Sequence, residues 1–121
     1  MAVRILIADD HRLFAEALRA ILAADSRLEV VGLAESGHDA VRQSAELEPD
    51  LILMDISMPG LDGVQATRQI REQRPGAKVL MVTGSDARQD FDAARTAGAS
   101  GYVTKDKIAA ELIDAILDVA A

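Results

Sequence analysis

The sequence LILMD at residues 51–55 decides the fold expected for this chain. Its four consecutive apolar residues predict a short strand buried on both faces, as in the centre of a parallel sheet. The strand ends on a carboxylate, Asp55, and the turn-forming sequence ISMPG follows it. Ligands of open α/β sheets bind at the carboxyl ends of strands, but aspartate also starts turns and caps helices. The other strand ends must therefore decide what Asp55 does.

The composition indicates a single acidic globular domain. Its 121 residues suffice for one domain with a core, and half of them are hydrophobic, which excludes a disordered chain. A formal net charge of -7 argues against a nucleic-acid-binding surface, because such surfaces are basic. The chain has no cysteine and no apolar run near the roughly 20 residues that span a bilayer. We expect a cytoplasmic protein without disulfides, thiolate metal sites or membrane contact.

Strand and helix patterns alternate along the whole chain. Strands are expected at residues 3–8, 28–34, 51–55, 78–82 and 101–104. Helices are expected at residues 11–24, from residues 36–39 to Pro49, at 64–73, up to Gly98, and from an N-cap at Asp106. Five βα units at this spacing predict a doubly wound five-stranded parallel sheet, (βα)5, with helices on both faces.

Helical periodicity predicts which side chains the helices bury. The expected inward residues are Phe14, Ala17, Leu18, Ile21 and Leu22 in the first helix, Ala40, Val41 and Ala45 in the second, and Ile108, Leu112, Ile116 and Val119 in the last. Glu29 marks the second strand as an edge strand. Turns are expected at Gly37, Gly60 and Gly63 and at residues 83–86.

Polar residues stand at four of the five expected strand ends: Asp9 and Asp10, Asp55, Thr83, and Lys105. Since these ends converge in a doubly wound sheet, three carboxylates should meet there. Two unit charges ~4 Å apart repel by about 4 kcal/mol at an effective dielectric near 20, so the cluster requires a cation. Oxygen-only ligands favour Mg²⁺ or Mn²⁺. With the ammonium and hydroxyl groups, that cation could bind a phosphoryl group held at Asp55.

Each of these residues has a structural alternative. The acidic pair at residues 9–10 could cap the first helix, and Thr83 is a common strand residue. Lys105 could be solvated surface. His11 is an unlikely ligand for an oxygen-preferring cation. Only the joint placement at the strand ends favours the functional interpretation.

Four segments resemble the receiver domain of two-component response regulators: IADDH at residues 7–11, LMDISMPGLDG at 53–63, VT at 82–83 and GASGYVTK at 98–105. The resemblance covers essentially the whole chain, residues 1–121, and implies a flavodoxin-like fold and a signalling switch, not an enzyme. It implies that Asp55 accepts a phosphoryl group from a histidine kinase. It further implies the following roles: Asp10, Asp55 and the Ser57 carbonyl as direct Mg²⁺ ligands, Asp9 as a ligand through water, Thr83 and Lys105 as contacts of the phosphoryl oxygens, and Thr83 with Tyr102 as the switch.

Two positions depart from the family pattern. Asp106 follows Lys105 where the family often has proline, and this form resembles the subgroup whose receivers precede a LuxR/NarL-type helix-turn-helix domain. Gly84 replaces the small alanine that commonly follows the switch threonine, which would loosen that loop. The subgroup implies that DNA is bound through a missing C-terminal domain. A Tyr102 switch would reshape the surface of the fourth helix, fifth strand and fifth helix, and we expect that surface, or the adjoining face of the first and fifth helices, to form a phosphorylation-dependent homodimer. The alternative is a stand-alone regulator that acts through protein–protein binding.

Other functional classes fit less well. A flavodoxin-like nucleotide or flavin binder would need backbone amides for phosphate after the first strand, where this chain has two carboxylates. A haloacid-dehalogenase-type phosphatase would need a second aspartate two residues after Asp55, where this chain has Ser57.

Overall fold

The computed structural model describes residues 2–84 and 87–121, and it confirms the five-stranded parallel sheet, with strand order β2-β1-β3-β4-β5. The strands are β1 (Val3–Ala8), β2 (Leu28–Ala34), β3 (Leu51–Met54), β4 (Val79–Thr83) and β5 (Gly101–Thr104). The helices are α1 (Arg12–Ala23), α2 (Gly37–Leu47), α3 (Gly63–Gln73), α4 (Arg88–Ala97) and α5 (Ile108–Ala120), with a 3₁₀ turn, η1 (Lys105–Lys107), before α5. Residues 85–86 of the turn predicted at 83–86 lie outside the described residues.

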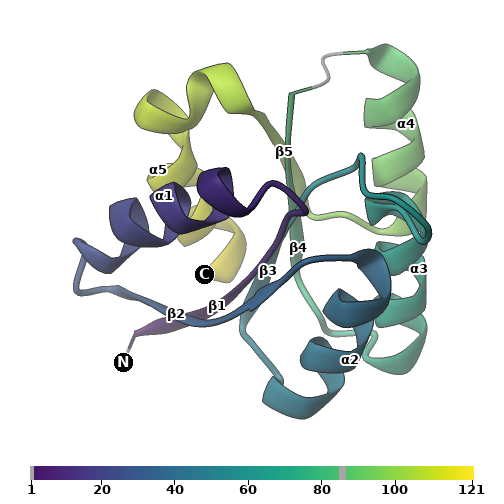
Figure 1. The fold of residues 1–121 in the computed structure, drawn as a ribbon, viewed down its shortest axis with the longest axis horizontal. Coiled ribbons are helices and arrows are strands. Elements are labelled where there is room, and N and C mark those ends of the chain that lie inside the picture. The colour runs from purple at the N-terminus through teal and green to yellow at the C-terminus, as the bar shows by residue number, and fades with distance from the viewer. Residues whose placement is uncertain (1, 85–86) are drawn as a thin grey trace.

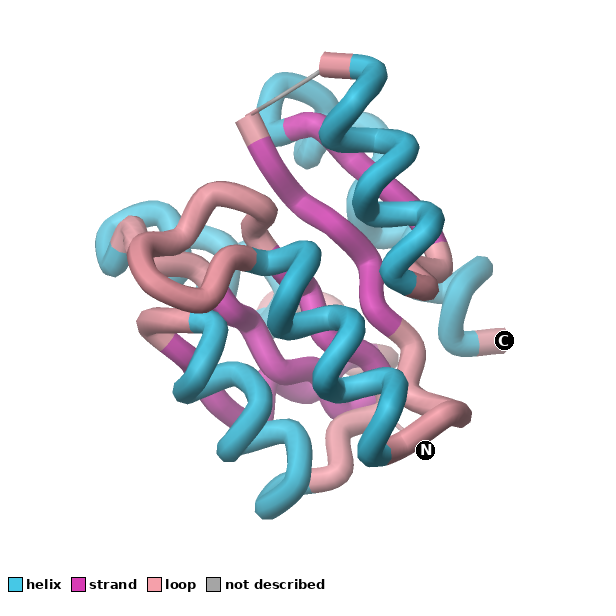
Figure 2. Tube along the Cα trace, turned by 90° about the vertical axis from the view of Figure 1, so that its right-hand side faces the viewer, coloured by secondary structure: helices cyan, strands magenta, loops and turns pink. Residues whose placement is uncertain are grey.

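The helices cover both faces of the sheet. Figure 1 shows α1 and α5 together on one side of the strands and α2, α3 and α4 on the other. Figure 2 shows α2, α3 and α4 lying side by side across their face. Across residues 2–84 and 87–121, no helix is both long and apolar enough to cross a membrane.

The central strand β3 contributes side chains to the core on both faces of the sheet. Ile52 and Met54 pack in the cluster under α2, α3 and α4, while Leu51 and Leu53 pack in the cluster under α1 and α5. All four side chains are 0–1% exposed. Each such burial stabilises the fold by roughly 1.5–3 kcal/mol, so the segment leading to Asp55 is firmly held.

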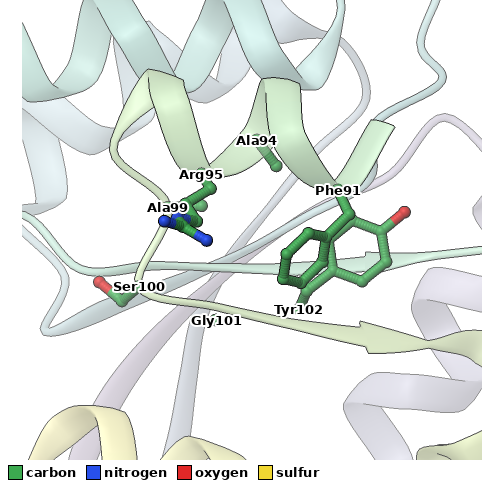
Figure 3. Close-up of a pocket in the computed structure, with 7 residues that line it drawn as sticks. All are labelled: Phe91, Ala94, Arg95, Ala99, Ser100, Gly101 and Tyr102. Atoms are coloured by element: carbon green, nitrogen blue, oxygen red, sulfur yellow. The ribbon is translucent and has the colours of Figure 1, made fainter. Parts of the chain in front are cut away.

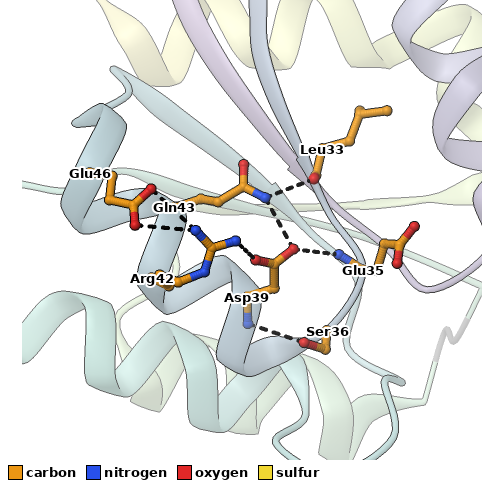
Figure 4. A network of polar contacts seen from close by, with 7 residues as sticks. All are labelled: Leu33, Glu35, Ser36, Asp39, Arg42, Gln43 and Glu46. Carbon is orange, nitrogen blue, oxygen red and sulfur yellow. Dashed lines mark hydrogen bonds and ion pairs between the residues drawn. The ribbon is translucent and has the colours of Figure 1, made fainter.

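Helix α2 is tied to the edge strand β2 by a polar network (Figure 4). The amide of Gln43 donates to the Leu33 carbonyl at 2.8 Å and to Asp39 at 3.0 Å. Ser36 caps the helix by accepting from the Asp39 amide at 3.1 Å. Burial works to raise the pKa of Asp39, but hydrogen bonds from Arg42, Gln43 and the backbone outweigh it and lower that pKa. The network fixes the start of α2, which borders the loop after β3.

Several predicted positions were wrong. Ala17 and Ile21 of α1 are exposed, and Ala15 is buried instead. Ala45 of α2 is likewise exposed. Asp106 lies inside η1, and Lys107 occupies the N-cap position of α5. The stripe predicted in α5 is confirmed, since Leu112 and Ile116 are buried there.

Candidate functional site

Strand register brings Asp9 and Asp55 to the same edge of the sheet. Ala8 of β1 pairs with Met54 of β3, so the residues that follow them lie at the same level. The Asp55 amide donates to the Ala8 carbonyl at 2.9 Å, and the Asp9 amide donates to the Ala34 carbonyl at 3.0 Å. The backbone of both aspartates is therefore fixed by the sheet, as the strand-end pattern predicted.

Lys105 reaches both carboxylates from the end of β5. Its Nζ lies 3.0 Å from Asp9 Oδ2 and 3.7 Å from Asp55 Oδ2. Thr83, which pairs with Thr104 in the sheet, ends β4 beside them and hydrogen-bonds through its side chain to Asp55. These residues border an open depression lined by Asp10, His11, Asp55, Ser57, Thr83, Gly84 and Lys105.

Burial makes the charge of Asp55 unfavourable. The residue is 5% exposed and Asp9 is 3% exposed. Burial first, and then the negative charge of Asp9, raise the pKa of Asp55. The Lys105 ammonium, the Ser57 amide and the Thr83 hydroxyl act in the opposite direction without cancelling the rise. The donors around Asp55 thus do not fully offset the cost of burying its charge beside Asp9.

Helix α3 packs directly beneath Asp55. The Gly63 amide donates to the Ile56 carbonyl at 2.9 Å, and a Cβ at Gly63 would lie 1.9 Å from the Asp55 carbonyl oxygen. Gly63 is therefore a close-approach residue at the start of a helix, and not simply the turn residue expected from the sequence. Gly60, with φ of +76°, does serve a turn.

The acidic residues suit a hard divalent cation. Ligand atoms of Asp9, Asp10 and His11 lie within 4.8 Å of one another. Asp10 is exposed, while the buried Asp9 is already oriented by accepting from the His11 amide at 2.8 Å. The carboxylate oxygens and the raised pKa of Asp55 fit an oxygen-preferring cation such as Mg²⁺, which would supply the missing positive charge.

Tyr102 faces α4 and lies against an aromatic neighbour. Its ring centroid is 5.5 Å from that of Phe91, with the planes tilted by 58°. The two rings lie at one end of a groove between α4 and β5, and Arg95 lies at the other (Figure 3). Phe91 is 44% exposed, so this pair borders the surface of the domain.

Two neighbours of the predicted residues were missed. Phe14 of α1 places its ring 4.1 Å from Lys105 Nζ, and Phe91 contacts Tyr102. The Phe14 contact joins elements that are distant in the sequence, whereas the Phe91 contact joins the consecutive elements α4 and β5. The helical pattern of α1 marked Phe14 as inward-facing but carried no signal for its partner.

Comparisons with known proteins agree with this fold. The response regulator receiver domain model matches residues 5–117. The transcriptional regulatory protein DegU of Brevibacillus brevis is 42% identical over 118 residues, which are 98% of this chain and 50% of that protein. The response regulator GacA of Pseudomonas viridiflava is 40% identical over 114 residues, 94% of this chain and 53% of that protein. A crystal structure of a LuxR-family two-component response regulator from Aurantimonas sp. SI85-9A1 is 36% identical with a TM-score of 0.95, covering 99% of this chain and 86% of that one.

This chain belongs to the response regulator receiver domain family of two-component systems. Its relatives include LuxR/NarL-type regulators, which confirms the subgroup that Asp106 after Lys105 indicated. The chain spans about half the length of the curated relatives it matches.

Proposed function

We propose that this domain accepts a phosphoryl group on Asp55 from a histidine kinase and changes its surface in response. The observation that carries the proposal is a buried carboxylate held between the Lys105 ammonium, 3.7 Å away, and the side-chain hydroxyl of Thr83. These two donor groups lie near the phosphoryl oxygens on which charge would develop during transfer to Asp55. The domain acts as a switch that is modified once per signal, not as a turnover catalyst.

The reaction balances without an added acid or base. A carboxylate oxygen of Asp55 attacks phosphorus, a new O–P bond forms, and the bond from phosphorus to the donor breaks. The electron pair of that broken bond leaves with the donor, as acetate from acetyl phosphate or as neutral imidazole from a phosphohistidine whose second ring nitrogen is already protonated. The product is a mixed anhydride at Asp55.

The chain's own residues orient the phosphoryl group and balance its charge. Asp9, Asp10, Asp55 and the Ser57 backbone carbonyl would hold Mg²⁺ (or Mn²⁺). The bound cation would neutralise charge on the equatorial oxygens. Lys105 and Thr83 donate to the remaining phosphoryl oxygens. The Ser57 amide, which already hydrogen-bonds to Asp55, keeps the attacking carboxylate in place.

The output of the switch is transcription control through a further domain. Among the relatives, DegU is a transcriptional regulatory protein, and the chain covers 50% of its length. We propose that DNA is bound by a C-terminal helix-turn-helix domain, not by this acidic domain. The alternative is a stand-alone regulator that acts by protein binding. The complete open reading frame distinguishes these two, because only the first continues into roughly 60 basic, helical residues.

Labelling with a small phosphodonor tests the phosphoryl acceptor. With acetyl phosphate and Mg²⁺, we expect one acid-stable, base-labile phosphoryl group per chain, located on Asp55 by mass spectrometry. Asp55→Asn should abolish the label, and EDTA should stop it because the acidic cluster then lacks its cation. Labelling of Asp55→Asn to the same level as the parent would refute the assignment.

A further inference from the structure

We infer that Phe14 is a positioning residue for Lys105, whose ammonium rests on the face of the Phe14 ring. Lys105 Nζ lies 4.1 Å from the ring centroid. Phe14 belongs to α1, whereas Lys105 follows β5, so the contact joins two elements that are distant in the sequence. The inference rests on the proposed phosphoryl transfer to Asp55.

The contact has the geometry of a cation–π interaction. A lysine ammonium within about 6 Å of an aromatic centroid is attracted by the negative face of the ring. The Lys105 side chain is only 23% exposed and Phe14 is half-buried, so water screens the attraction less than on an open surface. The chain has only two phenylalanines and one tyrosine, and one of these rings lies against the site lysine.

The ring holds Lys105 in a way that the carboxylates cannot. A lysine side chain has four flexible carbons, and the nearby Asp9 and Asp55 carboxylates attract its ammonium at 3.0 and 3.7 Å. A divalent cation bound by the same carboxylates would neutralise them and weaken their hold on Nζ. The quadrupole of the Phe14 ring does not change when the cation binds. Phe14 therefore keeps the Lys105 ammonium facing the phosphoryl position after the carboxylates have bound the divalent cation.

A packing role is the competing explanation, because Phe14 also borders the apolar cluster under α1 and α5. The two roles differ in what they require of the side chain. Packing requires apolar volume, which leucine partly retains. Holding Lys105 requires an aromatic face, which tyrosine keeps and leucine lacks.

The kinetic test compares Phe14→Leu and Phe14→Tyr, with Leu13→Ala as the control. Leu13 is 87% exposed on the same helix, one residue away. With acetyl phosphate and saturating Mg²⁺, we expect Phe14→Leu to label Asp55 about threefold to tenfold more slowly. Phe14→Tyr and Leu13→Ala should stay within about twofold of the parent. Thermal unfolding checks that each variant is folded.

A second measurement requires no phosphoryl chemistry. Protons that lie over a ring face are shifted upfield, so the ε-methylene protons of Lys105 should resonate upfield of the other lysines, with and without Mg²⁺. The resonance is assigned by its loss in Lys105→Arg. Phe14→Leu should abolish the upfield shift, while Phe14→Tyr and Leu13→Ala preserve it.

The outcomes separate this inference from the proposed function. If Phe14→Leu labels at the parent rate, if Phe14→Tyr slows labelling as much as Phe14→Leu, or if Lys105 shows no upfield shift in the parent, the positioning role is wrong. If the parent is not labelled at Asp55, the proposed function fails. In that case an upfield shift would still support the Phe14–Lys105 contact, and its absence would reject it.

Discussion

The proposed function of Asp55 opposes the stability of the fold. This residue is buried beside Asp9, and both its burial and that neighbouring charge raise its pKa. A buried carboxylate with a raised pKa binds its proton more tightly in the folded state than in the unfolded state. The charged form, which would attack phosphorus in the proposed reaction, is therefore the form that destabilises the protein in the absence of a cation.

Asp55→Asn should be more stable than the parent at pH 7 in EDTA. The stabilising effect of proton binding at Asp55 is fully present below the unfolded pKa and is lost as the pH rises through the raised folded pKa. The advantage of the asparagine variant should therefore shrink as the pH falls through that folded pKa. Urea unfolding at several pH values measures this difference. A stability difference that stays constant with pH would contradict the raised pKa.

At the level of residues, Asp9, Asp55, Thr83 and Lys105 meet as predicted because each stands at or just after a strand end. A parallel register places such positions together whatever the helices do. The partnership between Phe14 and Lys105 could not be predicted, because it depends on how α1 packs against the sheet. A local pattern indicates an inward face but not the side chain that the face will meet.

Helix α3 packs closely against the residue that follows β3, Asp55, through Gly63. A Cβ at Gly63 would lie 1.9 Å from the Asp55 carbonyl oxygen, a backbone atom that cannot rotate away. Gly63→Ala should therefore displace α3 or the end of β3. We expect it to lower the free energy of unfolding by roughly 1–3 kcal/mol and to slow Asp55 labelling. Urea unfolding and the acetyl phosphate assay measure the two effects.

Gly84→Ala is the matched control for the stability effect of this substitution. Within the described part of the chain, no heavy atom lies within 4 Å of a Cβ built at Gly84. The added methyl group should restrict the unfolded chain and stabilise the protein by about 0.4–1 kcal/mol. If Gly63→Ala were as well tolerated as Gly84→Ala, close packing of α3 would not be what positions Asp55.

At the level of elements, the order and type of the strands and helices were predictable. Which side chains each helix buries was not. Ile21 follows the helical pattern of α1, yet it is 48% exposed, while the small side chain of Ala15 is buried. The angle at which α1 crosses the sheet decides which side chains it buries. Asp106 was expected to cap α5, but the chain first makes the 3₁₀ turn η1.

If the acidic site binds a cation as proposed, that binding should stabilise the whole domain. Any ligand that binds only the folded state stabilises it, by about 1.4 kcal/mol at ten times its dissociation constant. Mg²⁺ should therefore raise the thermal midpoint of the parent by roughly 5 °C at that concentration. Asp10→Asn, which removes an exposed expected ligand, should lose most of this rise. An equal rise in Asp10→Asn would place the cation elsewhere.

The proposed switch connects Asp55 to the surface formed by α4 and β5. Thr83 is buried next to Asp55, and Tyr102 lies on the neighbouring strand with its ring against Phe91 of α4 (Figure 3). Phosphorylation adds roughly two negative charges beside Thr83. If the Thr83 hydroxyl moves to the phosphoryl group, it vacates space into which Tyr102 can turn. This turn would separate the two rings and reshape the groove between α4 and β5.

The change can be followed with the single tyrosine of the chain, which contains no tryptophan. We expect the fluorescence of Tyr102 to change when Asp55 is phosphorylated, because the ring then leaves Phe91 for a more buried position. We further expect sedimentation to show a homodimer. The surface proposed for this contact is that of α4, β5 and α5, or the adjoining face of α1 and α5. Asp55→Asn treated identically is the control, since it has the same tyrosine and no acceptor. An unchanged tyrosine signal together with an unchanged mass, at full occupancy of Asp55, would reject this mechanism.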